Sequence, residues 1–463
     1  MANPVHSERA QPANDPPPLP QAGEGQAIDL LITPRWLIPI EPHGAVLEGH
    51  AVAVSGGDIA DVLPVQEALD RYAPAQRIDL PGHVLMPGLV NLHTHAAMTL
   101  LRGIADDLPL ADWLRKRIWP MEAKHVSAAF VRDGTLLACA EMLRGGITCF
   151  NDMYFFPEAA AQAARRLGMR AALGLVAIEF PTAYAADTGD YLSKGLAARD
   201  ALRDDPLLSF CLAPHAPYTV SDATFARIVT LAAQLDLPIH IHVHETAQEV
   251  DESVRLHGAR PLRRLERLGV LGPGLIAVHA AHLDADDMQL LKKYACSVAH
   301  CPTSNMKLAS GMAPVAALLE NDIRVGLGSD GAASNNRLDL FQEMRHAALL
   351  GKAVSGNAAA LDAHTVLRMA TLNGAAALGL ERRIGSIRAG KAADLCAIRL
   401  DALETRPCFD PASHLLYAAG REHVSHVWIN GRLRVVNGAL YEYDIIELLD
   451  TINLWQNKPG FML

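Results

Sequence analysis

Short apolar runs alternate along the chain with longer stretches of helical period. At both ends the runs are strand-like and are divided by turn residues, Ser55-Gly56-Gly57 near the start and Asn430-Gly431 near the end. Alternating segments separated by such turns are typical of β-hairpins. We therefore expect residues 27–84 and 386–440 to build one small β-sandwich domain together.

Between these ends the sequence predicts eight repeated strand and helix units. This order is typical of helices packed around a parallel sheet. The expected strands are His83–Asn91, Gly146–Asp152, Met169–Ile178, Leu207–Pro214, Leu237–His244, Leu275–Ala280, Cys296–Pro302 and Ile323–Asp330. Eight units favour an α/β fold with a closed, TIM-type (β/α)8 barrel over residues 85–385, in which chemistry lies at the carboxyl ends of the strands.

The composition favours an enzyme that acts on a small molecule. Of the 463 residues, 50% are hydrophobic and 20% are charged, which is enough apolar material for a large core. The net charge of −10 argues against nucleic acid as a partner. The seven cysteines are scattered and never form Cys-x-x-Cys, a pattern that fits a reducing cytoplasm.

The two termini carry no targeting or membrane signal. Residues 1–26 lack the basic and apolar regions of a secretion signal, and their Pro, Ala and Gly content predicts a disordered leader. No apolar stretch reaches the length of about 18 residues that a transmembrane helix needs. Residues 441–463, rich in Ile, Leu and Phe, form a tail that docks either on the barrel or on a neighbouring copy.

Two histidines, His93 and His95, follow the first expected barrel strand. Residues two apart in an extended chain point to the same side, so both can bind one ion. His-x-His alone is more often a surface or turn feature. Its place after Pro87-Gly88, at the end of a barrel strand, favours a metal site.

The fifth expected strand carries three histidines and is followed at once by Glu245. The three share one parity and are expected to face the barrel interior: His240, His242 and His244. Buried imidazoles need partners, so these residues are either ligands or hydrogen-bonded core residues. The spacing alone does not decide which histidine binds.

The sixth and eighth expected strands end in His279 and Asp330. An aspartate after a strand can simply cap the next helix. Here, however, four strands deliver metal-binding or proton-transferring side chains to one end of the barrel. Imidazole and carboxylate ligands favour zinc, with iron, manganese and cobalt as alternatives.

Several longer motifs resemble those of the amidohydrolase superfamily. They are HTHAAMTLLRG, NDMYF, APHAPYTVS, HVHET, AHCPTSNMKL and SDGAASNN. Within the superfamily the chain is most similar, over about residues 28–440, to the methylthioadenosine/S-adenosylhomocysteine deaminases and the related triazine hydrolases of the chlorohydrolase group. The metal ligands that the resemblance implies are His93, His95, His242 and Asp330.

The same resemblance implies the catalytic groups. Glu245 matches the acid/base, His279 matches the histidine that contacts the attacking water, and Asp330 takes part in proton transfer as well as in metal binding. His240 and His244 are left as supporting residues, the latter a candidate for the pocket wall. The fourth strand lacks the lysine that bridges two metals in many relatives, so we expect one divalent ion, zinc.

The resemblance also implies a nucleoside pocket. Glu122 matches a carboxylate that accepts hydrogen bonds from the ribose hydroxyls, His215 a histidine that contacts the substrate, and Trp113 an apolar wall. Glu245 is expected to contact the substrate too. Some relatives place arginines after the third strand against the homocysteine carboxylate, whereas residues 177–195 of this chain hold Lys194 as their only basic residue.

The expected function is hydrolytic deamination of an adenosine-type nucleoside, methylthioadenosine, S-adenosylhomocysteine or adenosine, to the inosine analogue and ammonia. One alternative is a guanine-, pterin- or triazine-type aminohydrolase on the same metal site. A second is a barrel without activity that serves as a binding protein, although this chain keeps every expected ligand. The resemblance implies a homo-oligomer. The metal identity and the preferred 5′ substituent stay open.

Overall fold

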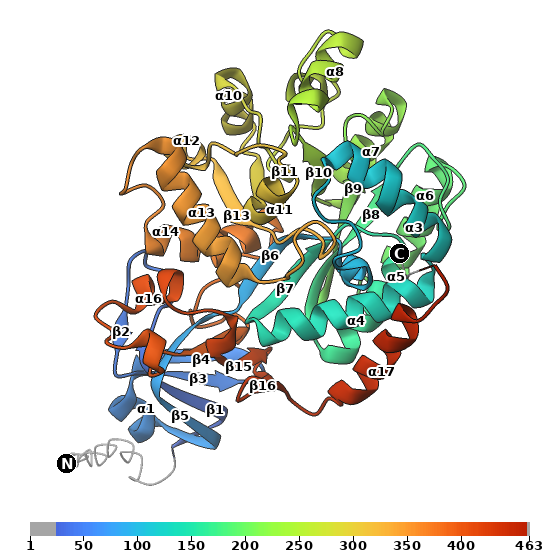
Figure 1. Cartoon of the computed structure of the whole chain (residues 1–463). Coiled ribbons are helices and arrows are strands. Elements are labelled where there is room, and N and C mark those ends of the chain that lie inside the picture. Colours follow the sequence, from blue (N-terminus) through green and yellow to red (C-terminus); the bar gives the residue numbers. More distant parts are fainter. Residues whose placement is uncertain (1–24, 461–463) are drawn as a thin grey trace, which may run out of the picture.

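The computed structural model describes residues 25–460, which form two β-sheets surrounded by helices (Figure 1). One sheet has eight strands and the other has nine. The predicted leader, residues 1–26, lies outside the described residues except for Gly25 and Gln26, and Gln26 already begins a strand. No helix within residues 25–460 is long and apolar enough to cross a membrane.

The eight-stranded sheet is the predicted barrel, and its strands pair in parallel and in chain order. The strands are β6 (Leu89–Thr94), β7 (Ile147–Asp152), β8 (Arg170–Ala177), β9 (Leu208–Pro214), β10 (Ile239–Val243), β11 (Leu275–His279), β12 (Ser297–His300) and β13 (Arg324–Leu327). The TIM-type fold is therefore confirmed.

The expected start of the first barrel strand, at His83, is wrong. Residues 83–87 end β5 (Tyr72–Pro87) and pair with β14 (Leu395–Arg399) in the other sheet, and β6 starts only at Leu89. The chain passes between the sheets at Pro87-Gly88. Because residues 84–87 and all of β6 are buried, one continuous apolar run covers the passage and hides it.

The barrel closes between β6 and β13 through side chains as well as backbone. The Asp330 backbone N–H donates to the His93 carbonyl (3.0 Å), and the Asn91 side chain both donates to Ser329 Oγ (2.7 Å) and accepts from the Ser329 N–H (2.9 Å). A Cβ on Gly328 would lie 2.8 Å from His93 Cβ, so glycine permits this approach. The closure places Asp330 beside His93.

The flanking segments form the predicted β-sandwich. Its strands are β1 (Gln26–Leu37), β2 (Leu47–Glu48), β3 (His50–Ser55), β4 (Asp58–Pro64), β5, β14, β15 (Val424–Ile429), β16 (Arg432–Val436) and β17 (Ala439–Leu440). The sheet folds over so that its ends meet: a Cβ on Gly57 would lie 2.8 Å from the Asn430 carbonyl oxygen. Ile32, Val54 and Trp428 fill the space between the layers.

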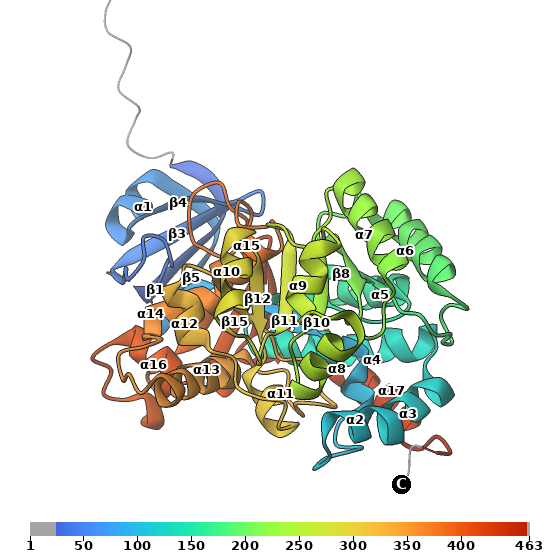
Figure 2. The ribbon, with the colours of Figure 1, turned by 90° about the horizontal axis from the view of Figure 1, so that it is seen from above.

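Helices cover the outside of the barrel and form the rim above its strands. Those between barrel strands are η1 (Ala96–Leu101), α2 (Leu110–Trp113), η2 (Leu114–Ile118), α3 (Trp119–His125), α4 (Ala128–Arg144), α5 (Pro157–Leu167), α6 (Thr188–Leu202), α7 (Asp222–Leu235), α8 (Ala247–His257), α9 (Pro261–Arg267), α10 (Ala285–Lys293), α11 (Pro302–Lys307) and α12 (Val315–Glu320). Figure 2 shows α6 and α7 on the side of the barrel away from the flanking sheet.

The remaining helices are α1 (Val65–Arg71), α13 (Leu340–Ser355), α14 (Ala363–Arg368), η3 (Met369–Asn373), α15 (Gly374–Ala377), η4 (Leu403–Thr405), α16 (Pro411–Tyr417), η5 (Arg421–His423) and α17 (Ile445–Gln456). Of these, α17 lies in the C-terminal tail and packs on α4. The Trp455 Nε1–H donates to Asp133 Oδ2 (2.9 Å), and its ring meets Phe130 edge-on. The described part of the tail thus docks on the barrel of its own chain.

Candidate metal centre and adjoining pocket

The four expected ligands lie together at the carboxyl ends of the barrel strands. His93 and His95 come from the end of β6, His242 comes from β10, and Asp330 follows β13. His93 Nε2 is 3.2 Å from His242 Nε2, and Asp330 Oδ1 is 3.3 Å from His93 Nε2 and 3.4 Å from His95 Nε2. His279, from the end of β11, offers a nitrogen to the same space.

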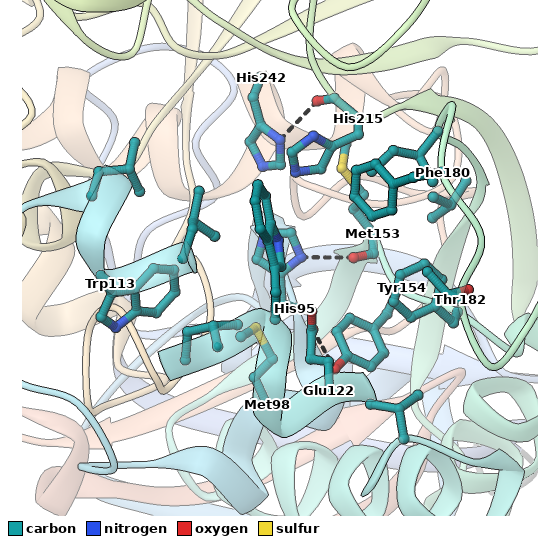
Figure 3. A pocket seen from close by; sticks show the side chains of 18 of the residues that line it. His95, Met98, Trp113, Glu122, Met153, Tyr154, Phe180, Thr182, His215 and His242 are labelled. Carbon is teal, nitrogen blue, oxygen red and sulfur yellow. Dashed lines mark hydrogen bonds between the residues drawn. The ribbon is translucent and has the colours of Figure 1, made fainter. Parts of the chain in front are cut away.

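In two of the expected ligands, His95 and His242, the hydrogen bond at Nδ1 fixes where the imidazole proton lies. His95 Nδ1 lies 2.7 Å from the Met153 carbonyl and His242 Nδ1 lies 2.8 Å from the His215 carbonyl (Figure 3). A carbonyl only accepts, so both Nδ1 atoms carry the proton and both Nε2 atoms present lone pairs. These lone pairs and the Asp330 carboxylate repel one another unless a cation lies between them. The donor set therefore fits a metal ion of the kind bound by nitrogen and oxygen.

Burial and charge tune these groups in opposite directions. Burial lowers the pKa of His93 to about 4, which favours the neutral imidazole that metals bind. Burial by itself would raise the pKa of Asp330, but its contacts with His93 and His95 hold that pKa well below its ordinary value. His279 and Asp330 have φ angles of 69° and 59°, a left-handed conformation at the strand ends that turns both side chains at the rim.

Glu245 follows β10 and lies beside the centre. Its Oε1 is 3.8 Å from His279 Nε2 and accepts a hydrogen bond from Ser310 Oγ (3.4 Å). Burial raises the pKa of Glu245. A carboxyl group of raised pKa beside this cluster is suited to taking up and releasing a proton.

Two residues that the sequence reasoning did not single out hold Glu245 and His279 in place. The Glu249 carboxylate accepts the backbone N–H groups of His244 (2.9 Å) and Glu245 (2.8 Å), and so orders the turn that carries Glu245. Asn305 Oδ1 lies 2.9 Å from His279 Nδ1. Asn305 belongs to the SNMKL motif, which was the available signal. Glu249 was marked only by its place one helical turn after Glu245.

A cavity of about 390 Å³ opens onto the metal centre. Most of its wall is apolar and comes from α2, η2, α3 and the ends of β7 and β8, including Leu110, Trp113, Trp119, Phe155, Ile178 and Phe180. No lysine or arginine is among the described residues that line it. Such a size and lining suit a small, largely apolar organic molecule.

The expected substrate residues all line this cavity. Trp113 contributes to one wall, and His215 lies near His242, with its Nδ1 2.9 Å from Thr219 Oγ1. The Glu122 carboxylate accepts a hydrogen bond from the Tyr154 hydroxyl (2.8 Å; Figure 3). Burial raises the pKa of Glu122 to about 6, and the Tyr154 bond opposes part of this rise. Tyr154, in the NDMYF motif, was not singled out from the sequence.

The other two histidines of the fifth strand separate. His240 lies inside the barrel with its Nε2 3.0 Å from His93 Nδ1. His244 does not line the pocket, so that expectation is wrong: its Nδ1 lies 3.1 Å from the His282 carbonyl and its Nε2 accepts the Leu262 N–H. β10 ends at Val243 and His244 has a φ of 54°, so the strand's alternation no longer applies to it.

The family model described as "Amidohydrolase family" matches residues 84–434, about three-quarters of the chain. The chain belongs to the amidohydrolase family. As an amidohydrolase with deaminase-named relatives, it is a hydrolase that acts on C–N bonds. The cluster of histidines and an aspartate is the candidate centre for such chemistry.

Three relatives show how far the likeness extends. The chain is 46% identical to a 5-methylthioadenosine/S-adenosylhomocysteine deaminase of Teredinibacter turnerae, over 94% of this chain and 98% of that protein. It is 52% identical to a solved adenosine deaminase from Xanthomonas campestris with bound zinc, with a TM-score of 0.93 over 94% of this chain and 99% of the other. An atrazine chlorohydrolase from Arthrobacter aurescens, 24% identical with a TM-score of 0.84 over 92% and 99%, shares the fold.

Proposed function

We propose that this amidohydrolase removes the amino group of an adenosine-type nucleoside by hydrolysis, yielding the inosine analogue and ammonia. One observation carries the proposal: three of the four expected ligands, Glu245 and the Glu122 carboxylate line one largely apolar cavity. The ligand cluster and Glu245 suit the amidine carbon of a base, and the Glu122 carboxylate suits the hydroxyls of a ribose. The names of the relatives, deaminases of methylthioadenosine, S-adenosylhomocysteine and adenosine, support the same substrate class.

The ligand cluster fits one divalent ion, and the proposal takes it to be zinc, held by His93, His95, His242 and Asp330. When bound, such an ion activates water at neutral pH. Support comes from the inward-facing nitrogen lone pairs and from the zinc in the Xanthomonas campestris relative. The fourth strand offers no lysine for bridging a second ion.

The proton movements belong to Glu245, Asp330 and His279. Glu245 takes a proton from the attacking water and delivers it to the ring nitrogen next to the amino-bearing carbon, a role that fits its burial and raised pKa. Asp330 takes the second proton of that water and passes it to the departing amino nitrogen, which leaves as ammonia. His279 Nε2, 3.8 Å from Glu245 Oε1, orients the water.

The cavity favours a substrate with a small apolar 5′ group. Glu122 accepts hydrogen bonds from the ribose hydroxyls, while His215 and Trp113 contact the base and the apolar part. Lys194, the only basic residue within residues 177–195, donates to the Tyr184 carbonyl (2.7 Å) and to Asp190 (2.9 Å) and does not line the cavity. A carboxylate or phosphate at the 5′ end would therefore enter without a cation to pair with it. We rank methylthioadenosine and adenosine above S-adenosylhomocysteine.

We also propose that the enzyme is cytoplasmic and forms a homo-oligomer. The seven cysteines are all free thiols, and all but Cys408 are buried, which fits a reducing compartment. Sedimentation of the purified chain tests the assembly, and a single species at the mass of one chain would refute that part.

Ammonia release tests the function directly. The zinc-loaded protein is assayed with methylthioadenosine, adenosine, S-adenosylhomocysteine, guanine and melamine, next to Glu245→Gln and to Glu252→Gln as a control at a half-buried glutamate outside the cavity lining. We expect turnover of the adenosyl compounds that Glu245→Gln loses and Glu252→Gln keeps. Activity on guanine or melamine alone would support the alternative aminohydrolases, and silence on all five would refute both.

A further inference from the structure

The outer nitrogen of each ligand histidine is hydrogen-bonded, but the partner of His93 differs in kind. His95 and His242 each face a backbone carbonyl. His93 Nδ1 instead lies 3.0 Å from Nε2 of a second imidazole, that of His240, and the two rings cross at 71°. Both side chains are fully buried, so water does not compete for this bond.

An imidazole partner leaves open a choice that a carbonyl excludes. If His240 donates to His93, the single proton of neutral His93 is on Nε2, and that nitrogen cannot bind a cation. If His93 donates to His240, its Nε2 is a free lone pair and points at the metal centre. The chemical state of His240 therefore decides whether His93 is a ligand.

The hydrogen bond between His93 and His240 leaves the second nitrogen of His240 unpaired, which is unfavourable in free energy. His240 Nδ1 is buried and finds no hydrogen-bond partner among residues 25–460. When Nε2 accepts from His93, the proton of His240 is on this unpaired Nδ1, an unfavourable arrangement in a dry interior. An apolar side chain would fill the same position without an unpaired polar atom. Packing alone thus does not account for an imidazole here.

We propose that His240 is a positioning residue of the metal centre. Its Nε2 accepts the Nδ1–H of His93 and so holds His93 in the tautomer whose Nε2 faces Asp330 and His242. The role concerns metal binding itself and goes beyond the proposed deamination, because it applies to any reaction run on this centre.

Zinc affinity tests the proposal without reference to activity. Full-length protein is stripped with a chelator, and its zinc dissociation constant is measured by competition with a chromophoric chelator. His240→Leu removes the acceptor, and we expect affinity to fall by about 10- to 100-fold, the usual effect of losing a group that orients a ligand. His240→Gln keeps an acceptor oxygen and is expected to recover most of this loss. His423→Leu is the control, since His423 is also buried but pairs with Glu404 in the flanking segment.

The melting temperature of the metal-free variants separates positioning from packing. Wild-type zinc affinity in His240→Leu would overturn the proposal. The proposal would also be overturned if His240→Leu and His240→Gln lost zinc affinity equally and both had a lower metal-free melting temperature. That result would mean that His240 acts through packing of the barrel interior. If neither variant folds, ¹⁵N-histidine NMR of the zinc-loaded wild type decides: a proton on His93 Nδ1 supports the proposal, and a proton on Nε2 refutes it. Deaminase activity enters none of these outcomes, so the two proposals can fail separately.

Discussion

The Glu122–Tyr154 pair predicts a pH dependence of substrate binding. Only the ionised Glu122 carboxylate accepts from both ribose hydroxyls, and burial raises its pKa to about 6. Binding is therefore complete above that pKa and is lost as the pH falls through it. At pH 5 about one-tenth of Glu122 is ionised, so KM for methylthioadenosine should be about tenfold higher than at pH 8.

Removing the Tyr154 hydroxyl should raise the pKa of Glu122 further, because the carboxylate loses a hydrogen bond that favours its ionised form. A hydrogen bond to a charged acceptor contributes about 1.5–3 kcal/mol, and we take about 1 kcal/mol here because Glu122 faces the open cavity. About 1 kcal/mol corresponds to about 0.7 pKa unit, so Tyr154→Phe should move the inflection to higher pH by about that amount and raise KM roughly threefold at pH 6, with KM at pH 8 and kcat little changed. Tyr184→Phe is the matched control, because the buried Tyr184 hydroxyl has no hydrogen-bond partner among residues 25–460.

The assay is initial rates of ammonia release between pH 5 and 8, with zinc saturating at each pH. A 2′,3′-dideoxy substrate lacks the groups that Glu122 binds and should show no inflection in KM near pH 6. A flat KM for the ribosyl substrate, or the same inflection for the dideoxy substrate, would refute the assignment of Glu122 to the ribose.

Three further predictions concern the centre and the tail. Glu245→Gln should lower kcat by about 10²- to 10⁴-fold with zinc content unchanged, as measured by rates and metal analysis, and a smaller loss would exclude it as the acid/base. Asn305→Leu should lower kcat by about tenfold with KM unchanged, because His279 Nδ1–H loses its acceptor. Asn305→Asp keeps an acceptor and should retain activity. Equal losses in the two variants would argue against a role of Asn305 in fixing the tautomer of His279. Trp455→Phe should lower stability by about 1–3 kcal/mol in urea unfolding, because Asp133 Oδ2 loses its buried donor, and an unchanged midpoint would show that the tail adds little.

Much of the architecture was readable from local pattern. Strand alternation, helical period and Gly- or Asn-Gly turns are set by neighbouring residues, so the eight barrel units and the two β-rich ends followed from the sequence. The same holds for His93 and His95, whose spacing in an extended strand places both on one side. Their assignment as metal ligands came from family resemblance, and spacing alone did not supply it. The assignment of Glu122 and His215 to the substrate pocket came from the same resemblance.

Local pattern failed where the chain leaves regular geometry. The passage between sheets at Pro87-Gly88 is buried on both sides, so hydrophobicity does not mark it. His244 shares the parity of His242 in the sequence, but a positive φ after Val243 turns it toward α9. Alternation predicts a direction only while the backbone stays extended.

Only the tertiary structure decided which polar groups meet. Asp330 reaches His93 because barrel closure joins the first and last strands, Tyr154 reaches Glu122 across the cavity, and His240 lies behind His93. These partners are far apart along the chain, and no local periodicity encodes their contact. Sequence by itself therefore determined the elements and the kind of ligand, while the packing of those elements around one axis determined the tautomers, the pKa values and the shape of the pocket.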